Sequence, residues 1–345
     1  MTDIDIRIEG RAGRIMLNRP EALNALTYEM CREIDAALQT WAEEPSVELL
    51  VIDGAGERAF CAGGDIQEMY DTGTAGDYAY GKRFWADEYR MNARLFDFPK
   101  PVVTLLHGFT MGGGVGVGCH GSHRVVCEDS QIAMPECGIG LVPDVGGSLI
   151  LARAPGRLGE YLGATSARMG PGDAIHAGFA DYYIPREAWP SLIAELCASG
   201  DWEAVDRTAQ TPPASPLAAQ QAEIDETFDG DAIIDIVNML KPRVDAFAED
   251  ALKMIGRNSP LAVACAIELV HRARLKDNDI CHALGQEYRF TARSMEKGDF
   301  LEGIRAAIID RDKSPKWFHE DATRVPAVDV AGMLLPLGAE ALRFE

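Results

Sequence analysis

Residues 101–147 decide the fold, and their sequence is PVVTLLHGFTMGGGVGVGCHGSHRVVCEDSQIAMPECGIGLVPDVGG. The apolar, β-branched run Val102–Leu106 predicts a buried strand, because it is short and bounded by Pro and Gly. The glycine run Gly112–Gly114 follows it. Glycines after a strand let the backbone approach a ligand closely, and they leave N–H groups free where a helix begins. Such donors suit an oxygen atom that becomes an anion during a reaction.

Two acids follow the glycine run in turn-rich settings. Glu136 comes directly after a proline, and Asp144 lies between Pro143 and a Val-Gly-Gly sequence. Each acid alone could equally be a helix cap or a turn residue. An oxyanion donor followed by two carboxylates forms a coherent set, however, and the set predicts acyl chemistry.

Composition sets limits on partners and location. The chain has 345 residues, 47% of them hydrophobic, so it can bury a large core in one or two domains. A formal net charge of −21 without a basic run argues against nucleic acid and against an anionic membrane. The N-terminus lacks signal-peptide and transit features, and no apolar run approaches the ~20 residues that span a bilayer. Eight scattered cysteines predict free thiols, and we expect a cytoplasmic protein.

Strand and helix patterns alternate as far as about residue 185, which predicts an α/β fold. Residues 54–65 are loop-like, and residues 71–80 are rich in Gly and Asp. The expected organisation is a core over residues 1–200 and a mostly helical region over residues 201–345. Within the second region, a Pro/Ala/Ser-rich connection is predicted over 208–220 and helices over 231–255, 259–275, 278–297 and 300–310.

Four separated groups of residues form an ordered set. They are Ala59–Asp65 (AFCAGGD), His107-Gly108 leading into the glycine run, Met134–Gly147 (MPECGIGLVPDVGG) and Asp299–Trp317. The last group contains the sequences Glu-Gly, Arg-Ala and Asp-Arg-Asp. Together they resemble the crotonase, or enoyl-CoA hydratase/isomerase, superfamily. Within it, the third and fourth groups are most similar to the 3-hydroxyisobutyryl-CoA hydrolase branch. The resemblance covers about residues 4–318.

The resemblance implies a spiral of ββα units followed by helices, and an acyl-CoA thioester as the substrate. It places the oxyanion hole at the backbone N–H groups of Gly64 and Gly113, and it places Ala62 beside the adenine of CoA. It implies no resident cofactor, because CoA is part of the substrate. Superfamily members commonly form trimers or pairs of trimers, so a homo-oligomer is possible.

One departure from the superfamily pattern affects the chemistry. Hydratases of this superfamily use two glutamates; the second matches Glu136, but Gly116 stands where the first should be. Asp144, and Glu88 upstream, fit the hydrolase branch. We expect Glu136 to activate water or to attack the carbonyl itself. Asp144 would hold the substrate 3-hydroxyl or assist protonation of the leaving thiolate, and Glu88 would line the acyl pocket.

Other interpretations remain open at this stage. A hydratase or isomerase acting on 2-enoyl-CoA keeps the fold, and so does a non-catalytic acyl-CoA binding protein. Gly116-x-Gly118-x-x-Gly121 formally matches a dinucleotide fingerprint, but a lone match of this kind is weak. The Cys and His residues of 119–127 match no standard zinc spacing, and no Gly-x-Ser-x-Gly elbow is present. Glu88 could be a solvated helix residue, and Asp65 is expected to be structural.

Overall fold

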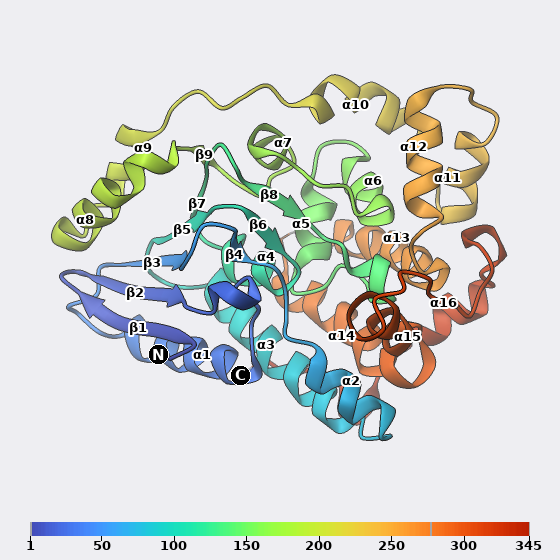
Figure 1. Cartoon of the computed structure of the whole chain (residues 1–345), viewed down its shortest axis with the longest axis horizontal. Coiled ribbons are helices and arrows are strands. Elements are labelled where there is room, and N and C mark those ends of the chain that lie inside the picture. The colour runs from blue at the N-terminus through green and yellow to red at the C-terminus, as the bar shows by residue number, and fades with distance from the viewer. Residues whose placement is uncertain (1, 277, 345) are drawn as a thin grey trace. The chain divides into compact units, whose positions relative to one another are not determined.

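A computed structural model describes residues 2–276 and 278–344, and Figure 1 traces its elements. The chain divides into two compact units that are interleaved along the sequence. Unit 1 contains residues up to Asp65, Arg90–Ala133 and Arg168–Ala218, and unit 2 contains Ile66–Tyr89, Met134–Ala167 and the chain from Ala219 onwards. The predicted domain boundary near residue 200 stays a prediction.

Unit 1 is built on two sheets. The larger has the order β1-β2-β3-β5-β7-β9, in which β1 and β2 form an antiparallel hairpin and the other neighbours are parallel. The smaller, β4-β6-β8, is parallel throughout. The strands are β1 Ile4–Glu9, β2 Ala12–Leu17, β3 Leu49–Gly54, β4 Ala59–Cys61, β5 Val102–Leu106, β6 Phe109–Met111, β7 His123–Val126, β8 Gln131–Ala133 and β9 Tyr182–Tyr183.

From β3 onwards, consecutive strands alternate between the two sheets. β3 and β4, β5 and β6, and β7 and β8 each give one strand to the larger sheet and one to the smaller. With a helix between pairs this is a ββα spiral, so the predicted α/β fold class is confirmed. The loop expected over residues 54–65 was wrong at β4. A strand this short carries too few residues to show a period of two.

One buried apolar cluster of unit 1 lies on one face of the larger sheet. Alternate residues of β3, β5 and β7 point to this face because side chains alternate along a strand. Helices α8 (Trp189–Ser199) and α9 (Glu203–Thr208) cover it. The buried cluster includes Leu49, Val51, Val103, Leu105, Val125, Trp189, Leu192, Leu196 and Val205.

Helix α1 (Tyr28–Ala42) begins at a side-chain cap and has one apolar face. The Thr27 side chain accepts a hydrogen bond from the N–H of Met30 at 3.2 Å, which satisfies one of the unpaired donors at the helix start. Its buried face contains Met30, Ile34, Leu38 and Trp41. Two shorter helices of unit 1 are α4 (Gly113–Gly118) and α7 (Pro171–His176).

Helices form most of unit 2. α13 is apolar on nearly all sides and packs against α5 and α6, as expected for a central helix. α3 and α10 each include residues of both units. The helices are α2 Gln67–Thr74, α3 Ala79–Phe96, α5 Gly147–Arg153, α6 Leu158–Thr165, α10 Pro216–Thr227, α11 Ile233–Leu240, α12 Ala246–Ile255, α13 Pro260–Arg274, α14 Ile280–Lys297, α15 Phe300–Ile304 and α16 Ala327–Met333.

Several predicted helix boundaries were wrong. The helix expected over 231–255 is two helices, because Pro242 follows α11 and Asp245 caps α12 by accepting from the N–H of Ala248 at 2.9 Å. The connection expected over 208–220 contains the start of α10, and the Gly-rich residues 71–80 contain the end of α2. Residues 305–309 continue α15 as a π-helix.

All eight cysteines have free thiols, as predicted. Within residues 2–276 and 278–344, no helix combines the length and apolarity needed to cross a membrane.

Candidate active site

Three predicted acids come together inside unit 2. Glu88 lies on α3, Glu136 begins a 3-10 helix over Glu136–Ile139, and Asp144 lies in the loop before α5. Their exposed fractions are only 3%, 4% and 4%. Burial and, after it, the negative charge of Asp144 raise the pKa of both glutamates, so the three carboxyl groups share one electrostatic environment. The interpretation of Glu88 as a solvated helix residue was wrong.

The sequence around Glu136 fixes a tight turn. The 3-10 helix ends at Gly140, whose φ of +75° is in the left-handed region, where glycine is favoured. A side chain there would also lie 2.5 Å from the backbone carbon of Asp299. Only glycine therefore lets the turn that carries Glu136 lie against the start of α15.

The fourth motif group supports this turn from the other side. A side chain at Gly303, on α15, would lie 2.1 Å from the carbonyl oxygen of Ile139, so α15 packs backbone to backbone against the 3-10 helix. Asp299 accepts hydrogen bonds from the Ser259 hydroxyl at 2.6 Å and from the Phe318 N–H at 2.9 Å. The packing at Gly303 and the hydrogen bonds of Asp299 therefore support the turn that carries Glu136.

The Asp144 loop is held in an unusual backbone conformation. Val145 and Gly146 have φ values of +52° and +81°. A β-branched residue rarely adopts the left-handed region, and such a conformation costs on the order of 1–3 kcal/mol. The N–H of Gly147 closes the turn on the carbonyl of Asp144 at 2.6 Å, and the Tyr89 hydroxyl donates to Oδ2 of Asp144 at 2.6 Å.

Burial raises the pKa of every carboxyl group in this cluster. The pKa of Asp144 rises to about 7, although the hydrogen bond from Tyr89 opposes the rise. The pKa of Glu136 lies well above its ordinary value because of burial and the nearby charges of Asp144, Glu287 and Glu88. Interacting acids of this kind lose their protons one after another, so at neutral pH the cluster can contain both an acid and a base.

Glu136 is also incompletely bonded. Its Oε2 atom is buried and has no hydrogen-bond partner among the residues that the structure describes. A buried acceptor without a donor is costly, and such atoms in native proteins call for an explanation. An oxygen that must bind water or a substrate group provides one.

The predicted oxyanion donors lie in unit 1. Gly64 follows β4, and Gly113 begins α4 just after β6. Since β4 and β6 are parallel neighbours, both glycines lie at the same edge of the smaller sheet. Within the described ranges, neither N–H group donates to a protein acceptor. Their role as an oxyanion hole, which the family resemblance implies, stays a prediction.

Close packing explains the glycine after Gly113. A side chain at Gly114 would lie 2.2 Å from the carbonyl oxygen of Cys61, so α4 starts directly against β4. Ala62 is half-buried, and its own N–H donates to the carbonyl of Leu23 at 3.0 Å. Asp65 accepts from Arg19 at 2.9 Å, a structural contact as predicted, although made to a side chain and not to the backbone.

Sequence reasoning missed three residues of the unit 2 cluster, namely Tyr89, Ser148 and Glu287. The Glu287 carboxylate accepts from the N–H groups of Gly146 and Ser148 at 2.8 and 3.0 Å. A signal for Glu287 was present, because it lies on the buried face of α14 with Ala283, Leu284 and Thr291. A charged residue within an apolar helical stripe marks a functional or paired group.

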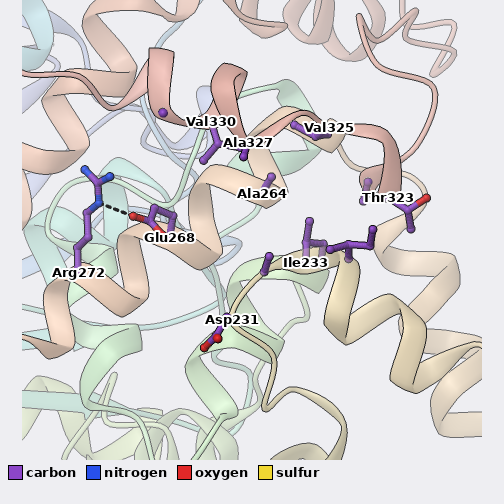
Figure 2. Close-up of a pocket in the computed structure, with 13 residues that line it drawn as sticks. Asp231, Ile233, Ala264, Glu268, Arg272, Thr323, Val325, Ala327 and Val330 are labelled. Atoms are coloured by element: carbon purple, nitrogen blue, oxygen red, sulfur yellow. Dashed lines mark hydrogen bonds and ion pairs between the residues drawn. The ribbon is translucent and has the colours of Figure 1, made fainter.

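A separate pocket lies elsewhere in unit 2 (Figure 2). It has a volume of about 310 Å³ and mostly aliphatic walls from α11, α13 and residues 322–331. The ion pair between Glu268 and Arg272, at 2.7 Å, lies at one end. None of the predicted site residues lines this pocket. Within the described part of the chain, no group of three or more His, Cys, Asp or Glu side chains could hold a metal ion.

The ββα spiral and its free backbone donors define a protein of the crotonase fold, and comparisons with known proteins agree. The model of the enoyl-CoA hydratase/isomerase family matches residues 12–334. This chain belongs to that family.

Two curated relatives are 3-hydroxyisobutyryl-CoA hydrolases described as mitochondrial. The protein from Bos taurus is 36% identical over 348 residues, covering 97% of this chain and 89% of the relative. The protein from Danio rerio is 38% identical over 323 residues, covering 89% and 83%.

Solved structures carry other descriptions. An enoyl-CoA hydratase from Rhodobacter sphaeroides is 55% identical, with a TM-score of 0.93 over 99% of this chain and all of that one. A carnitinyl-CoA dehydratase from Mycobacterium thermoresistibile is 41% identical, with a TM-score of 0.95 over 100% and 99% of the two chains.

Proposed function

We propose that this protein hydrolyses a short 3-hydroxyacyl-CoA thioester, and that its substrate is 3-hydroxyisobutyryl-CoA, an intermediate of valine breakdown. The observation that carries the proposal is the buried pair Glu136 and Asp144 together with Gly116 at the position of the first hydratase glutamate. The names of the curated relatives support the same reaction.

The proposed chemistry divides the work among these residues. The N–H groups of Gly64 and Gly113 stabilise the negative charge that develops on the thioester oxygen, and removing one such donor typically costs about 3–4 kcal/mol of barrier. Glu136 either takes a proton from the attacking water or attacks the carbonyl itself. Asp144 binds the 3-hydroxyl or delivers a proton to the departing thiolate, and Glu88 lines the acyl pocket. Ala62 contacts the adenine of CoA.

Thiol trapping tests the reaction directly. We expect thiol release from 3-hydroxyisobutyryl-CoA and 3-hydroxypropionyl-CoA and none from crotonyl-CoA. Glu136→Gln should abolish release, and Asp144→Asn should reduce it sharply. A fully active Glu136→Gln enzyme would refute the mechanism.

Labelled water separates the two routes for Glu136. In a single turnover in H₂¹⁸O, a nucleophilic Glu136 acquires ¹⁸O in its own carboxylate when water cleaves the acyl-enzyme anhydride at the glutamyl carbonyl. A general-base Glu136 leaves the label only in the released acid, as does attack of water on the acyl carbonyl of the anhydride. Label in the peptide that contains Glu136, measured by mass spectrometry, therefore establishes the nucleophilic route.

A second candidate reaction is hydration of a 2-enoyl-CoA. The description of the 55% identical solved structure as an enoyl-CoA hydratase favours it. It predicts loss of the enoyl absorbance of crotonyl-CoA without thiol release. Gly116 argues against it, because the second carboxylate would have to come from another residue.

Two further assignments stay predictions. A homo-oligomer, a trimer or a pair of trimers, is expected from the family resemblance, and no resident cofactor is expected. The cytoplasmic location also stays a prediction, and the curated relatives are described as mitochondrial.

A further inference from the structure

Glu287 lies in the same buried cluster as Glu88, Glu136 and Asp144, and the proposed reaction gives it no step. It lies on α14 and is fully buried. Its Oε2 atom accepts from the N–H of Gly146 at 2.8 Å, and its Oε1 atom accepts from the N–H of Ser148 at 3.0 Å and from the Ser148 hydroxyl. One side chain thus satisfies three donors of the loop that follows Asp144.

These hydrogen bonds hold the loop next to Val145, the residue with the least favourable backbone conformation. The donors at Gly146 and Ser148 lie one and three residues after Val145, whose left-handed φ of +52° an isolated chain would avoid. Asp144 immediately precedes that residue, so the conformation of the turn sets the direction in which its carboxylate points. A buried acceptor bonded to both N–H groups fixes that conformation.

α14 also reaches the other partner of Asp144. The Tyr89 hydroxyl donates to Asp144 Oδ2 at 2.6 Å and lies 3.5 Å from the hydroxyl oxygen of Thr291. Thr291 is one turn after Glu287 on the buried face of α14. A single helix face therefore supports Asp144 through its backbone and contacts the tyrosine that binds its side chain.

We propose that Glu287 is a positioning residue for the thioester reaction, which acts by fixing the orientation of the Asp144 carboxylate. The inference rests on the proposed function. Glu287→Gln keeps the size of the side chain, but its NH₂ group must then face one of two backbone N–H donors. The turn should relax away from that clash. Since small displacements of reacting groups are costly, kcat should fall about 10- to 100-fold while KM changes less than about threefold.

A double-mutant cycle separates positioning from simple structural support. Thiol release is measured for the wild type, Glu287→Gln, Asp144→Asn and the double variant. If Glu287 acts through Asp144, its replacement costs little once Asp144 is already neutralised. If Glu287 only supports the fold, the same fold-loss appears in both backgrounds.

The matched control is Glu160→Gln. Glu160 is also fully buried in unit 2, but its partners are Arg157, His271 and Arg274. Its replacement should lower the melting temperature and leave kcat near the wild-type value. A kcat loss in this control as large as that of Glu287→Gln would overturn the positioning role.

The outcomes also distinguish a failure of the proposed function from a failure of the positioning role of Glu287. A wild type that releases no thiol from any hydroxyacyl thioester overturns the proposed function and, with it, this role. An active wild type with equal Glu287→Gln losses in both backgrounds overturns the positioning role alone. If Glu287→Gln does not fold, Ser148→Ala removes only the hydroxyl donor, and its smaller loss of kcat should likewise disappear in the Asp144→Asn background.

Discussion

The hydrogen bond from Tyr89 to Asp144 gives a direct test of the electrostatics of the cluster. Tyr89→Phe removes one hydroxyl from a fully buried side chain and leaves the ring in place. The lost bond, 2.6 Å long, stabilises the ionised carboxylate, so its removal must raise the pKa of Asp144. The wild-type pKa is already about 7 because of burial.

The size of the effect follows from the charge of the acceptor. A hydrogen bond to an ionised group contributes about 1.5–3 kcal/mol, and 1.36 kcal/mol corresponds to one pH unit. We therefore expect the midpoint for titration of Asp144 to rise by about 1–2 pH units in Tyr89→Phe. The pH limb of kcat that depends on Asp144 should move upward with it.

Carbon-13 NMR of protein labelled at the aspartate carboxyl carbon measures this midpoint, and the Asp144 signal is assigned by its loss in Asp144→Asn. Tyr288→Phe is the matched control, because the Tyr288 hydroxyl donates to the backbone carbonyl of Lys82 at 3.2 Å. Its Asp144 signal should titrate as in the wild type. An unchanged midpoint in Tyr89→Phe would show that the hydroxyl does not stabilise the ionised form, and the account of the cluster would fail.

Two further predictions concern stability. Folding raises the pKa of Asp144 to about 7 and that of Glu287 to about 8, so the folded state binds more protons than the unfolded state between about pH 4 and 8. The free energy of unfolding should therefore fall as pH rises through that window, by up to ~1.4 kcal/mol per pH unit for each group. Thermal melts of Asp144→Asn should show a shallower decline with pH than those of the wild type. Gly114→Ala should destabilise the folded protein by about 1–3 kcal/mol or more, because the new methyl carbon would lie 2.2 Å from the carbonyl oxygen of Cys61. Gly285→Ala is the control, because this helical position has open space around it, and the change should stabilise the folded protein by about 0.5–1 kcal/mol. Denaturant titrations measure both differences.

How much of this could be predicted from the sequence depended on local signals. The strand Val102–Leu106 has a local pattern of its own, and this prediction was confirmed. The strands of the smaller sheet are too short for any period to show, so that sheet was missed. The family resemblance supplied the spiral that local patterns could not.

Sequence reasoning also could not predict how the buried acids of unit 2 are held in place. Glu136 and Asp144 lie in a recognisable stretch, but the contact from Glu287 to Gly146 joins residues 141 positions apart in the sequence. No local pattern reports such a pairing. A carboxylate in an apolar helical stripe indicates only that some partner must exist, because an unpaired buried charge is too costly to keep.

The cost of the cluster is itself an argument for its function. Several features of one region of unit 2 oppose folding. They are four carboxyl groups with raised pKa values, the left-handed backbone conformation of Val145, and the Oε2 atom of Glu136, which has no hydrogen-bond partner among the described residues. A purely structural site would be better served by the arrangement at Glu160, where three basic side chains surround the carboxylate and lower its pKa. Selection for stability would remove the first arrangement and keep the second. Among the residues that the structure describes, these acids have raised pKa values and no basic partner, and groups that change charge near neutral pH suit the proton transfer that we propose.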